Sequence, residues 1–591
     1  MYKAPVAEIA FTLSHVVGSN VAIDTGEDGE LTDDLVNAIL AEAARFAENE
    51  IAPLAEVGDL EGAQLIDGAV RLAEGWPQLY RDWAAGGWNG LTASPEFGGQ
   101  GLPQRLNVAT LEIWNAASMA FGLAPTLTMG AIEALSAHGS TALKERYLAR
   151  MISGEWTGTM NLTEPQAGSD VGALTARAER NKDGSYRIFG QKIYITWGDH
   201  DAADNIIHLV LARLSDAPPG TRGISLFLVP KFMVEADGSL GARNDLFCHS
   251  LEHKLGIHGS PTCTMIYGDG RLGETPGAIG WLVGEENRGL ACMFTMMNNA
   301  RLAVAMQGVG ICEAATQKAL AYAQERRQGR AAGQRAAAMS PIVDHPDVAR
   351  MLLTMKALTK GARAITYARA HAIDLSHGSA DTAHWQARAA LLTPVAKAFA
   401  TDCGVDVASL GIQVHGGMGY IEETGAARLW RDARIAPIYE GTNGIQAIDL
   451  VTRKLPLGGG AAVRGLIDEM QAIATAVENS AIEGLGATAG KLQQALADLT
   501  AATEWLLAMQ AEERTEEALA GATPYLRLFG LALTGCYLAK GALADAGDGA
   551  EEGRIALAAF AAQNLLGETA GLKDQIVHGA TSLLAARMAL E

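Results

Sequence analysis

The stretch Ala173–Thr196, ALTARAERNKDGSYRIFGQKIYIT, decides the fold because it differs from the sequence on either side of it. Apolar and polar residues alternate around an Asp183-Gly184 pair, a pattern that predicts a β-hairpin. Further runs that are rich in β-branched residues and bounded by turn residues follow it: NIIHLVLARL, GISLFLVP and SPTCTMIYG. We therefore predict a small β domain at residues 157–285.

Helical periodicity flanks this β domain on both sides. Before it, LVNAILAEAARFAENEIAPLA and TALKERYLARMI repeat apolar residues at helical spacing, and longer segments such as PDVARMLLTMKALTKGARAITYARAHAI do so after it. The glycine run in LPLGGGAAVRG predicts a linker before a final Ala- and Leu-rich helical region. The predicted parts are an N-terminal extension at 1–30, a helical domain at 31–156, the β domain, a second helical domain at 286–456 and a C-terminal helical domain at 466–591.

Length and composition limit the function classes. The chain has 591 residues, of which 49% are hydrophobic, so several globular domains are expected. A net charge of -21 at pH 7 argues against nucleic acid or an anionic membrane as the main partner. The six cysteines form no CxxC pair, which is typical of reduced thiols. With no convincing signal peptide and no charge-free stretch long enough to span a membrane, we expect a cytoplasmic protein.

Several common metal-binding, nucleotide-binding and catalytic motifs are incomplete in this sequence. The segment DTGEDGELTDDL has Gly26 and Leu35 where a calcium loop needs an oxygen ligand and a bidentate glutamate. His253 and His258 lack the HExxH spacing of a zinc site, and no predicted strand precedes GVGICEA to make a dinucleotide-binding turn. No GxSxG nucleophile is present either. No metal site, dinucleotide fold or acyl-transfer nucleophile is predicted.

Glu440 stands in ARIAPIYEGTNGIQ, between an apolar run and a Gly-Thr-Asn-Gly turn. A single glutamate before a turn is usually a solvated residue at a helix start. The run Ile435–Ile438 brings no neutralising charge, however, and apolar surroundings raise the pKa of a carboxylate toward values that suit proton transfer. Thr442 or Asn443 can cap the following helix, whose first N–H groups suit an anionic ligand. The pattern predicts a base beside a phosphate-bearing cofactor.

Two other stretches could line a flat ligand. The turn in MNLTEPQAGSD, with Thr163 and Ser169, can cradle a phosphate or hydrogen-bond the edge of a heteroaromatic ring. In KIYITWG, Tyr194 and Thr196 have the same pleat parity, so we expect their side chains on one face. Taken alone, these are an ordinary loop and an ordinary strand face.

Two helical stretches carry weaker signals. Arg301 is predicted at a helix start, where the helix dipole disfavours a cation, so it either has an anionic partner or is exposed, and exposure is the simpler interpretation. The glycines of QVHGGMGYIEETG permit close approach of another molecule or chain. Helix termination explains one of these glycines but not three.

Eight motifs follow one another along the chain: SPEFGGQG, LTEPQAGSD, KIYITWG, EHKLGIHGSPTC, GEENRGL, NNARLAVAMQGVG, QVHGGMGYIEETG and LWRDARIAPIYEGTNGIQ. In this order they resemble the motifs of the acyl-CoA dehydrogenase family, with matches from about Leu31 to Leu455. The resemblance implies a mainly α protein with a central β domain, built from a helical domain, a β-barrel domain and a four-helix-bundle domain, plus a C-terminal helical bundle. It also implies non-covalently bound FAD.

The resemblance also implies roles for individual residues. Glu440 matches the catalytic base that takes the α-proton of an acyl-CoA thioester while the β-hydrogen leaves as hydride, which gives the trans-2-enoyl-CoA. After Arg326 the sequence departs from the family's frequent Thr-Phe-Gly, which weakens that assignment. Flavin contacts are implied for Leu162, Thr163, Ser169, Tyr194, Ile195, Thr196, Thr442, Asn443 and Gly444, contacts to a neighbouring subunit's flavin for Arg326, Gln413, Gly416 and Gly417, and acyl-CoA contacts for Ser169, Arg301 and Gly441.

The extra segments at the two ends resemble a longer bacterial subgroup of the family. This resemblance implies a homodimer that passes electrons to an electron-transferring flavoprotein. The implied reaction converts 3-methylmercaptopropionyl-CoA to methylthioacryloyl-CoA, in dimethylsulfoniopropionate demethylation, and the alternative substrate is long-chain fatty acyl-CoA of β-oxidation. Two rival hypotheses are an oxidase that uses oxygen directly and a non-catalytic scaffold that keeps acyl-CoA or flavin as a structural ligand.

Overall fold

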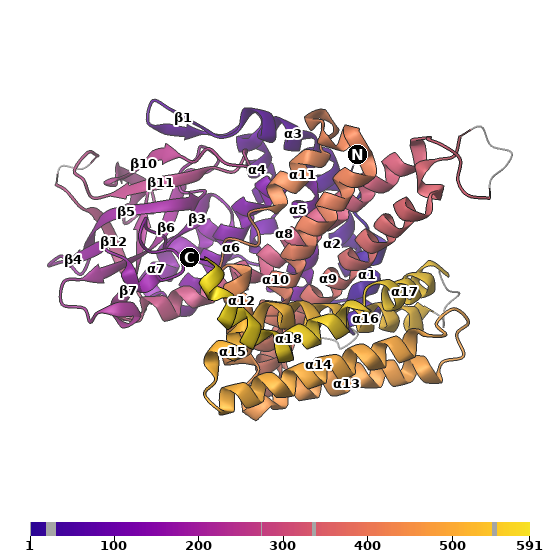
Figure 1. Ribbon diagram of the computed structural model, residues 1–591. Helices are drawn as coiled ribbons and strands as arrows, with labels where there is room; N and C mark the ends of the chain where they lie inside the picture. The colour runs from indigo at the N-terminus through magenta and orange to yellow at the C-terminus, as the bar shows by residue number, and fades with distance from the viewer. Residues whose placement is uncertain (1, 19–30, 273–274, 334–338, 546–551, 591) are drawn as a thin grey trace. The chain divides into compact units, whose positions relative to one another are not determined.

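The computed structural model describes residues 2–18, 31–272, 275–333, 339–545 and 552–590. The predicted N-terminal extension and the acidic segment DTGEDGELTDDL lie partly outside these residues. The chain folds as two compact units. The β-containing unit comprises Arg45–Pro103 and Ala117–Ala303, and the helical unit comprises Met1–Ala44, Gln104–Ala116 and Val304–Glu591 (Figure 1).

A closed sheet forms the centre of the β-containing unit. Its strands follow the order β10-β11-β5-β12-β7-β6-β3, and β4 pairs with both β5 and β6, which closes the ring. This confirms the predicted β-barrel domain, and the predicted hairpin at Asp183-Gly184 joins β4 to β5. The strands are β3 (Trp156–Asn161), β4 (Arg177–Arg180), β5 (Tyr186–Thr196), β6 (Asn205–Leu214), β7 (Ile224–Pro230), β10 (Leu246–Leu251), β11 (Thr262–Tyr267) and β12 (Ala278–Val283), with hairpins β1 (Gln64–Ile66)/β2 (Ala69–Arg71) and β8 (Phe232–Val234)/β9 (Leu240–Arg243).

Helices α6 and α7 pack against this sheet. Ser118 and Ser140 cap them, because each side chain accepts a backbone N–H from the first turn. Close contact between α6 and β3 requires Gly158, where an added Cβ would lie 2.4 Å from the Ala131 Cβ. The helices of this unit are α3 (Ala52–Glu61), α4 (Trp76–Ala85), α6 (Met119–His138), α7 (Thr141–Ile152) and part of α8 (Gly289–Glu325).

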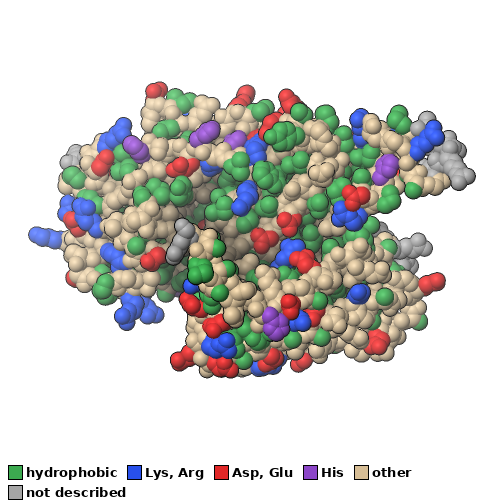
Figure 2. Space-filling view, in the orientation of Figure 1, with side chains coloured by type: hydrophobic (Ala, Val, Ile, Leu, Met, Phe, Trp, Pro, Cys, Tyr) green, Lys and Arg blue, Asp and Glu red, His purple; other side chains and the backbone are tan. Residues whose placement is uncertain are grey.

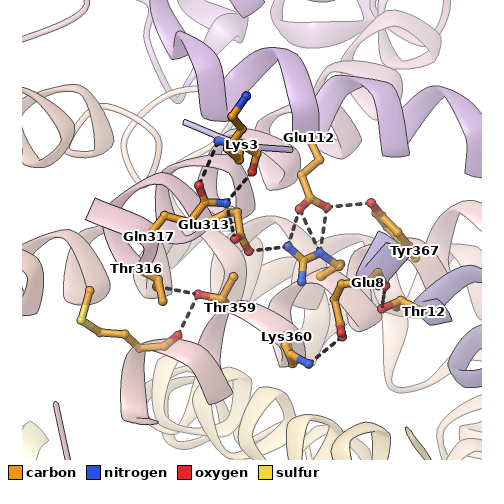
Figure 3. Close-up of polar contacts among 12 residues, drawn as sticks. Lys3, Glu8, Thr12, Glu112, Glu313, Thr316, Gln317, Thr359, Lys360 and Tyr367 are labelled. Carbon is orange, nitrogen blue, oxygen red and sulfur yellow. Dashed lines mark hydrogen bonds and ion pairs between the residues drawn. The ribbon is translucent and has the colours of Figure 1, made fainter. Parts of the chain in front are cut away.

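The helical unit is built around α8, α9 and α10. A buried ion cluster joins three of its helices: Arg363 of α9 contacts Glu112 of α5 at 2.5 Å and Glu313 of α8 at 2.7 Å, and Tyr367 donates to Glu112 (Figure 3). Its helices include α1 (Val6–Phe11), α2 (Asp33–Phe46), α5 (Gln104–Ala117), α9 (Pro346–Gly378), α10 (Thr382–His415), α11 (Ala426–Ala433), α12 (Asn443–Asp449), α13 (Ala461–Asn479), α14 (Thr488–Ala511), α15 (Thr515–Ala520), α16 (Ala522–Asp545), α17 (Glu552–Asn564) and α18 (Glu568–Ala585).

The C-terminal helices belong to this same unit. Helix α16 packs on α9 and α10 through glycines: a Cβ at Gly361 would lie 2.4 Å from Thr534 Oγ1, and one at Gly530 would lie 2.2 Å from Phe399 Cδ2. The glycine run that predicts a linker is an ordered turn, since Gly458 to Gly460 all have positive φ angles. The boundaries of the individual domains stay a prediction.

Among the residues that the structure describes, two helices are long and apolar enough to cross a membrane, by length and composition alone. They are Met119–His138 and Ala522–Asp545, and 89% and 72% of their apolar windows are buried inside the fold. Core helices of a globular protein pass the same test, because they too are apolar on most sides. Lys and Arg side chains alternate with Asp and Glu over the face drawn in Figure 2, as on an ordinary protein surface.

Candidate active site

The residues predicted to form the site lie in both units, and each group is described within its own unit. Leu162, Thr163, Ser169, Tyr194, Ile195, Thr196 and Arg301 belong to the β-containing unit. Arg326, Gln413, Gly416, Gly417, Glu440, Gly441, Thr442, Asn443 and Gly444 belong to the helical unit.

In the β-containing unit, the loop after β3 lies against the end of β5. The Thr163 carbonyl accepts a hydrogen bond from the Ile193 N–H at 2.9 Å. The Thr196 carbonyl accepts from the Thr159 hydroxyl at 2.7 Å. These bonds bring Leu162 and Thr163 beside the Tyr194–Thr196 segment, although about thirty residues separate them in the sequence. Thr163 and Thr196 are both partly exposed, so their polar atoms can reach a ligand.

A buried ion pair supports this loop. Lys192 of β5 donates to the Leu162 carbonyl at 2.9 Å and to the Glu164 carboxylate at 2.7 Å. Both side chains are almost fully buried, with exposures of 0% and 2%. Burial alone would raise the pKa of Glu164, but Lys192 and backbone hydrogen bonds from Thr175 and Ala176 hold the pKa below its usual range. Glu164 therefore stays charged and fixes the loop that carries Thr163.

Strand β5 is not regular at Tyr194, and this corrects the prediction drawn from pleat parity. The pairing with β11 shifts between Cys263 and Met265, whose partners are Ile195 and Lys192, so β5 contains a β-bulge. Tyr194 lies in the bulge with a φ of +60° and is 61% exposed. Simple alternation therefore does not place Tyr194 and Thr196 on one face, because the extra residue interrupts the period of two.

Arg301 and Ser169 differ in their surroundings. Arg301 lies inside α8, which begins at Gly289, and its side chain is 9% exposed. The prediction that it stands exposed at a helix start is wrong, because the helix extends through the Asn-rich segment before it. Its guanidinium donates to Asn298 Oδ1 at 3.2 Å. Ser169 is exposed in the loop between β3 and β4.

In the helical unit, Glu440 occupies a strained turn. Its φ is +57° and that of Gly441 is +84°, so two successive residues adopt the left-handed conformation. That region is unfavourable for a residue with a Cβ, and such strain is often found at functional sites. The preceding Tyr439 donates a hydrogen bond to Gln307 of α8. Burial and the nearby Glu440 carboxylate raise the pKa of Tyr439, which stays neutral as a donor.

Helix α12 follows this turn, and Thr442 is its N-cap. The Thr442 hydroxyl accepts from the Ile445 N–H at 3.2 Å, which settles the choice between Thr442 and Asn443. The Asn443 side chain turns toward α10, where its amide donates to Asp402 at 2.7 Å. Gly444 is exposed, and a Cβ there would meet only Thr442 Oγ1 at 3.8 Å, so the backbone is open to a ligand.

Lys397 is a residue of the site that sequence reasoning missed. It lies in α10 and is 0% exposed, and its ammonium donates to the Ala436 and Gly441 carbonyls and to Asn443 Oδ1, each at 2.9 Å. The signal was present in the sequence, because Lys397 is the one charge in an apolar helical run, TPVAKAFAT. A lysine in such a run is buried only when it is paired or hydrogen-bonded.

The C-terminal end of α10 is open and apolar. Gln413 is exposed, Gly416 ends the helix with a φ of +60°, and a Cβ at Gly416 or Gly417 would meet nothing within 4 Å. Close by, Met418 and Tyr420 are 48% and 85% exposed. Arg326 is exposed directly after α8, and its carbonyl accepts from the Ile342 N–H at 2.8 Å. Part of the segment after Arg326, residues 334–338, lies outside the described residues.

These groups fit FAD chemically. In the β-containing unit, an exposed aromatic residue and two accessible threonines border one strand end, which suits the edge and flank of a flavin ring. In the helical unit, the open backbone at Gly444, Gly416 and Gly417 allows close approach of a large ligand. Glu440, four residues before Gly444 in the helical unit, supplies a carboxylate that can accept a proton.

Comparisons with known proteins agree with this arrangement. The family models for the acyl-CoA dehydrogenase N-terminal, middle and C-terminal domains match residues 34–155, 159–269 and 287–455. The model for the acetyl-CoA dehydrogenase C-terminal-like domain matches residues 466–587. These matches cover both of the flanking helical regions, the barrel and the C-terminal helices.

Two relatives span almost the whole chain. The 3-methylmercaptopropionyl-CoA dehydrogenase of Ruegeria pomeroyi is 46% identical, over 99% of this chain and 100% of the relative. The broad-specificity linear acyl-CoA dehydrogenase FadE5 of Mycobacterium tuberculosis is 32% identical, over 96% of this chain and 95% of the relative.

Two solved structures are also similar. An acyl-CoA dehydrogenase from Bacillus anthracis in complex with FAD has a TM-score of 0.73 and 21% identity, over 97% of this chain and 93% of that one, which shows the fold. A chain from the electron transferring flavoprotein structure of Acidaminococcus fermentans has a TM-score of 0.59 and 27% identity, over 72% and 98%. With the fold, the matched domains and a full-length relative in agreement, this chain belongs to the acyl-CoA dehydrogenase family and is an FAD-dependent oxidoreductase acting on acyl-CoA.

Proposed function

We propose that this enzyme converts 3-methylmercaptopropionyl-CoA to methylthioacryloyl-CoA, with Glu440 as the catalytic base. The observation that carries the substrate is the 46% identity to a 3-methylmercaptopropionyl-CoA dehydrogenase over the full length of both chains. The reaction removes a proton from Cα and a hydride from Cβ, which leaves a Cα–Cβ double bond conjugated with the thioester. In dimethylsulfoniopropionate demethylation, this step would prepare the carbon chain for release of its sulfur.

The position of Glu440 supports its role as the base. An α C–H beside a thioester is only weakly acidic, so a carboxylate must be held within reach of it and kept from water. The positive φ angle of Glu440 sets it in a strained turn, as is often found at functional sites, and a backbone N–H there can serve as a donor to a developing negative charge. We assign the Glu440 carboxylate to the α-proton and its backbone N–H to the thioester oxygen. FAD, when bound, accepts the hydride that leaves Cβ.

The remaining site residues would bind and orient. In this proposal Leu162, Thr163 and Tyr194–Thr196 border the flavin ring, and Thr442–Gly444 hold the cofactor through their backbone rather than through the Asn443 side chain. Ser169, Arg301 and Gly441 bind the acyl-CoA. Arg301 is nearly buried, so its charge has to be matched by a polar partner such as the substrate or the Asn298 amide.

The similarity to a second relative supports linear fatty acyl-CoA as the alternative substrate class. A relative at 32% identity over 96% of this chain is a broad-specificity linear acyl-CoA dehydrogenase. The substrates of the two relatives differ chiefly in the acyl chain, and one methylene discriminates by only about 1–3 kcal/mol. Linear fatty acyl-CoA, including long chains, is therefore the alternative.

We further propose a homodimer, an electron-transferring flavoprotein as acceptor and a cytoplasmic location. The dimer proposal is supported by the open apolar surface at Met418 and Tyr420, because exposed apolar patches beside a site often bind another chain. In the dimer, Arg326, Gln413, Gly416 and Gly417 would reach the partner's flavin. The acceptor proposal is supported by the similarity to a chain in an electron transferring flavoprotein structure.

The first test is the visible spectrum of the purified protein without oxygen. We expect flavin bands that bleach faster with 3-methylmercaptopropionyl-CoA than with palmitoyl-CoA. Faster bleaching with palmitoyl-CoA would move the enzyme to fatty-acid oxidation, and oxygen consumption without an added acceptor would make it an oxidase.

The test of the base is Glu440→Gln. Glutamine keeps the shape of the side chain and cannot take the proton, so the variant should keep FAD and lose turnover by at least about 10³-fold. Turnover within tenfold of the parent enzyme would refute the assignment of Glu440.

A further inference from the structure

One buried lysine holds the turn that carries Glu440. The side chain of Lys397 is 0% exposed in the middle of α10. Its ammonium donates to the Ala436 carbonyl, the Gly441 carbonyl and Asn443 Oδ1, each at 2.9 Å. An ammonium has three N–H donors, enough to bind all three of these acceptors at once.

The acceptors lie on both sides of Glu440 in the sequence. Since one atom of Lys397 binds the chain at Ala436 and again at Gly441, the residues between these points cannot shift together without breaking a contact. The φ angle of Glu440, +57°, is unfavourable for a residue with a Cβ and persists only where surrounding contacts maintain it. Lys397 provides such contacts from a rigid helix.

Asn443 extends the same network. Its amide donates to Asp402 Oδ1 at 2.7 Å and to Thr401 Oγ1 at 3.0 Å, while its oxygen accepts from Lys397. Its backbone N–H donates to the Pro437 carbonyl at 2.9 Å, inside the turn. The amide is thus oriented by a cation at one end and a carboxylate at the other, and the turn is fixed to α10 at several points.

The burial of this charge needs a reason. A buried ammonium costs free energy unless it is hydrogen-bonded, and an apolar side chain would fill the core of α10 more easily. Two of the three acceptors of Lys397 are backbone carbonyls of the turn, which cannot form these bonds to an apolar residue. The charge is therefore explained by its contacts with the Glu440 turn rather than by packing.

We propose that Lys397 is a positioning residue for the dehydrogenation, which fixes the direction from which the Glu440 carboxylate meets the α-proton. The inference rests on the proposed role of Glu440 as the base. Lys397 does not act on the substrate itself, so its loss should slow proton removal while binding of the acyl-CoA is nearly unchanged. A base displaced by about 1 Å can lose about 10²-fold in rate.

The test uses Lys397→Met in the full-length, FAD-loaded enzyme. Methionine keeps an unbranched side chain of similar length and removes all three donors. The control is Lys360→Met. Lys360 is also largely buried, at 15% exposure, but it lies in α9 and its ammonium pairs with Glu8 of α1 at 2.8 Å. Flavin content is measured first, and the rate of flavin bleaching is then followed by anaerobic rapid mixing over a range of substrate concentrations.

We expect Lys397→Met to retain FAD and to show a limiting bleaching rate about 10–10³-fold lower, with an apparent Kd within threefold of the parent enzyme. Deuterium at Cα should slow the variant more than the parent, because proton removal becomes more rate-limiting. Lys360→Met should bleach at the parent rate. A merely structural role would change flavin content or Kd and leave the isotope effect unaltered.

Each other outcome overturns the inference. A parent-like limiting rate in Lys397→Met, or a loss of FAD or a raised Kd at an unchanged limiting rate, removes the positioning role. Glu440→Gln, assayed in parallel, separates the two proposals: if it stays active the base is wrong, and if it is inactive while Lys397→Met is normal only the inference fails. Should Lys397→Met not fold, Lys397→Gln takes its place, because its shorter side chain carries two donors instead of three and no charge, and a parent-like limiting rate in that variant also overturns the inference.

Discussion

Replacing Arg363 by methionine should destabilise the helical unit by about 3–5 kcal/mol, the usual cost of breaking a buried ion pair. Its guanidinium is 1% exposed and contacts Glu112 at 2.5 to 3.1 Å and Glu313 at 2.7 Å. Methionine keeps the apolar stem but leaves the Glu112 carboxylate, 0% exposed, with the Tyr367 hydroxyl at 2.6 Å as its partner (Figure 3). That hydroxyl can donate a hydrogen bond but cannot neutralise the charge.

The two carboxylates determine where in this range the cost falls. Glu313 is 13% exposed and accepts from Gln317 at 2.8 Å, so it can regain part of its hydration when Arg363 is removed. Glu112 has no such access to water, which places the cost in the upper half of the range. About 4 kcal/mol corresponds to a factor of roughly 10³ in the ratio of folded to unfolded protein.

The assay is urea unfolding, with hydrogen exchange of α5 and α9 to report on the helical unit alone. The matched control is Arg350→Met on the same helix, where Arg350 is 53% exposed and pairs with Asp347 at 2.8 Å, because exposed pairs contribute only about 0–1 kcal/mol. Adding Glu112→Gln to Arg363→Met should restore part of the loss, since it removes the uncompensated charge. Equal stability of Arg363→Met and Arg350→Met would refute the reasoning.

Two further predictions concern packing and pH. Gly308→Ala should lower the free energy of unfolding by about 1–3 kcal/mol, because the added Cβ would lie 2.3 Å from the Ala400 carbonyl oxygen and force α8 and α10 apart. Gly465→Ala adds a Cβ in open space and should not destabilise the protein. Calorimetry compares the two variants, and equal unfolding midpoints would contradict the steric argument. Burial raises the pKa of Asp374 to about 6 from 3.8, despite hydrogen bonds from the N–H groups of Arg105 and Gln104. The folded state therefore binds a proton more tightly than the unfolded state, so the stability of the parent relative to Asp374→Asn should fall by up to about 3 kcal/mol as pH rises from 4 to 7. Chemical unfolding of both proteins across that range measures this change, and a stability of the parent relative to Asp374→Asn that rises with pH would contradict the prediction.

The sequence predicted those features that depend on local pattern. Alternation around Asp183-Gly184 predicted the hairpin, and the gap between two apolar helical blocks predicted the barrel between them. The motif singles out Glu440 as a carboxylate between an apolar run and a Gly-Thr-Asn-Gly turn, and its role as the base stays a prediction. The sequence offered Thr442 and Asn443 as candidate caps of α12, and the hydrogen bond from the Ile445 N–H to the Thr442 hydroxyl identifies Thr442 as the cap.

The sequence did not predict features that depend on contacts distant in the chain. Tyr194 lies in a bulge that only the pairing of β5 with β11 reveals, because the bulge is a property of two strands. The sequence pattern predicts a helix start at Arg301, after MMNNA, whereas α8 begins twelve residues earlier, at Gly289. The close packing of α16 on α9 and α10 is another such feature, because nothing local indicates that Gly361 and Gly530 admit α16 so closely.

The two units position their candidate site segments by the same physical means. In the barrel, Lys192 donates to the Leu162 carbonyl and to Glu164, and in the helical unit Lys397 donates to the carbonyls of Ala436 and Gly441. Both lysines are 0% exposed and extend from a regular element to an irregular loop. A loop has few repeating hydrogen bonds of its own, so a single ammonium that binds several carbonyl oxygens restricts it more than packing alone can, because each bond has a direction. The loss of the Lys397 ammonium should therefore leave α10 intact and loosen the Glu440 turn, whereas the loss of the Lys192 ammonium should also destabilise the barrel, because it leaves the buried Glu164 carboxylate without its counter-charge.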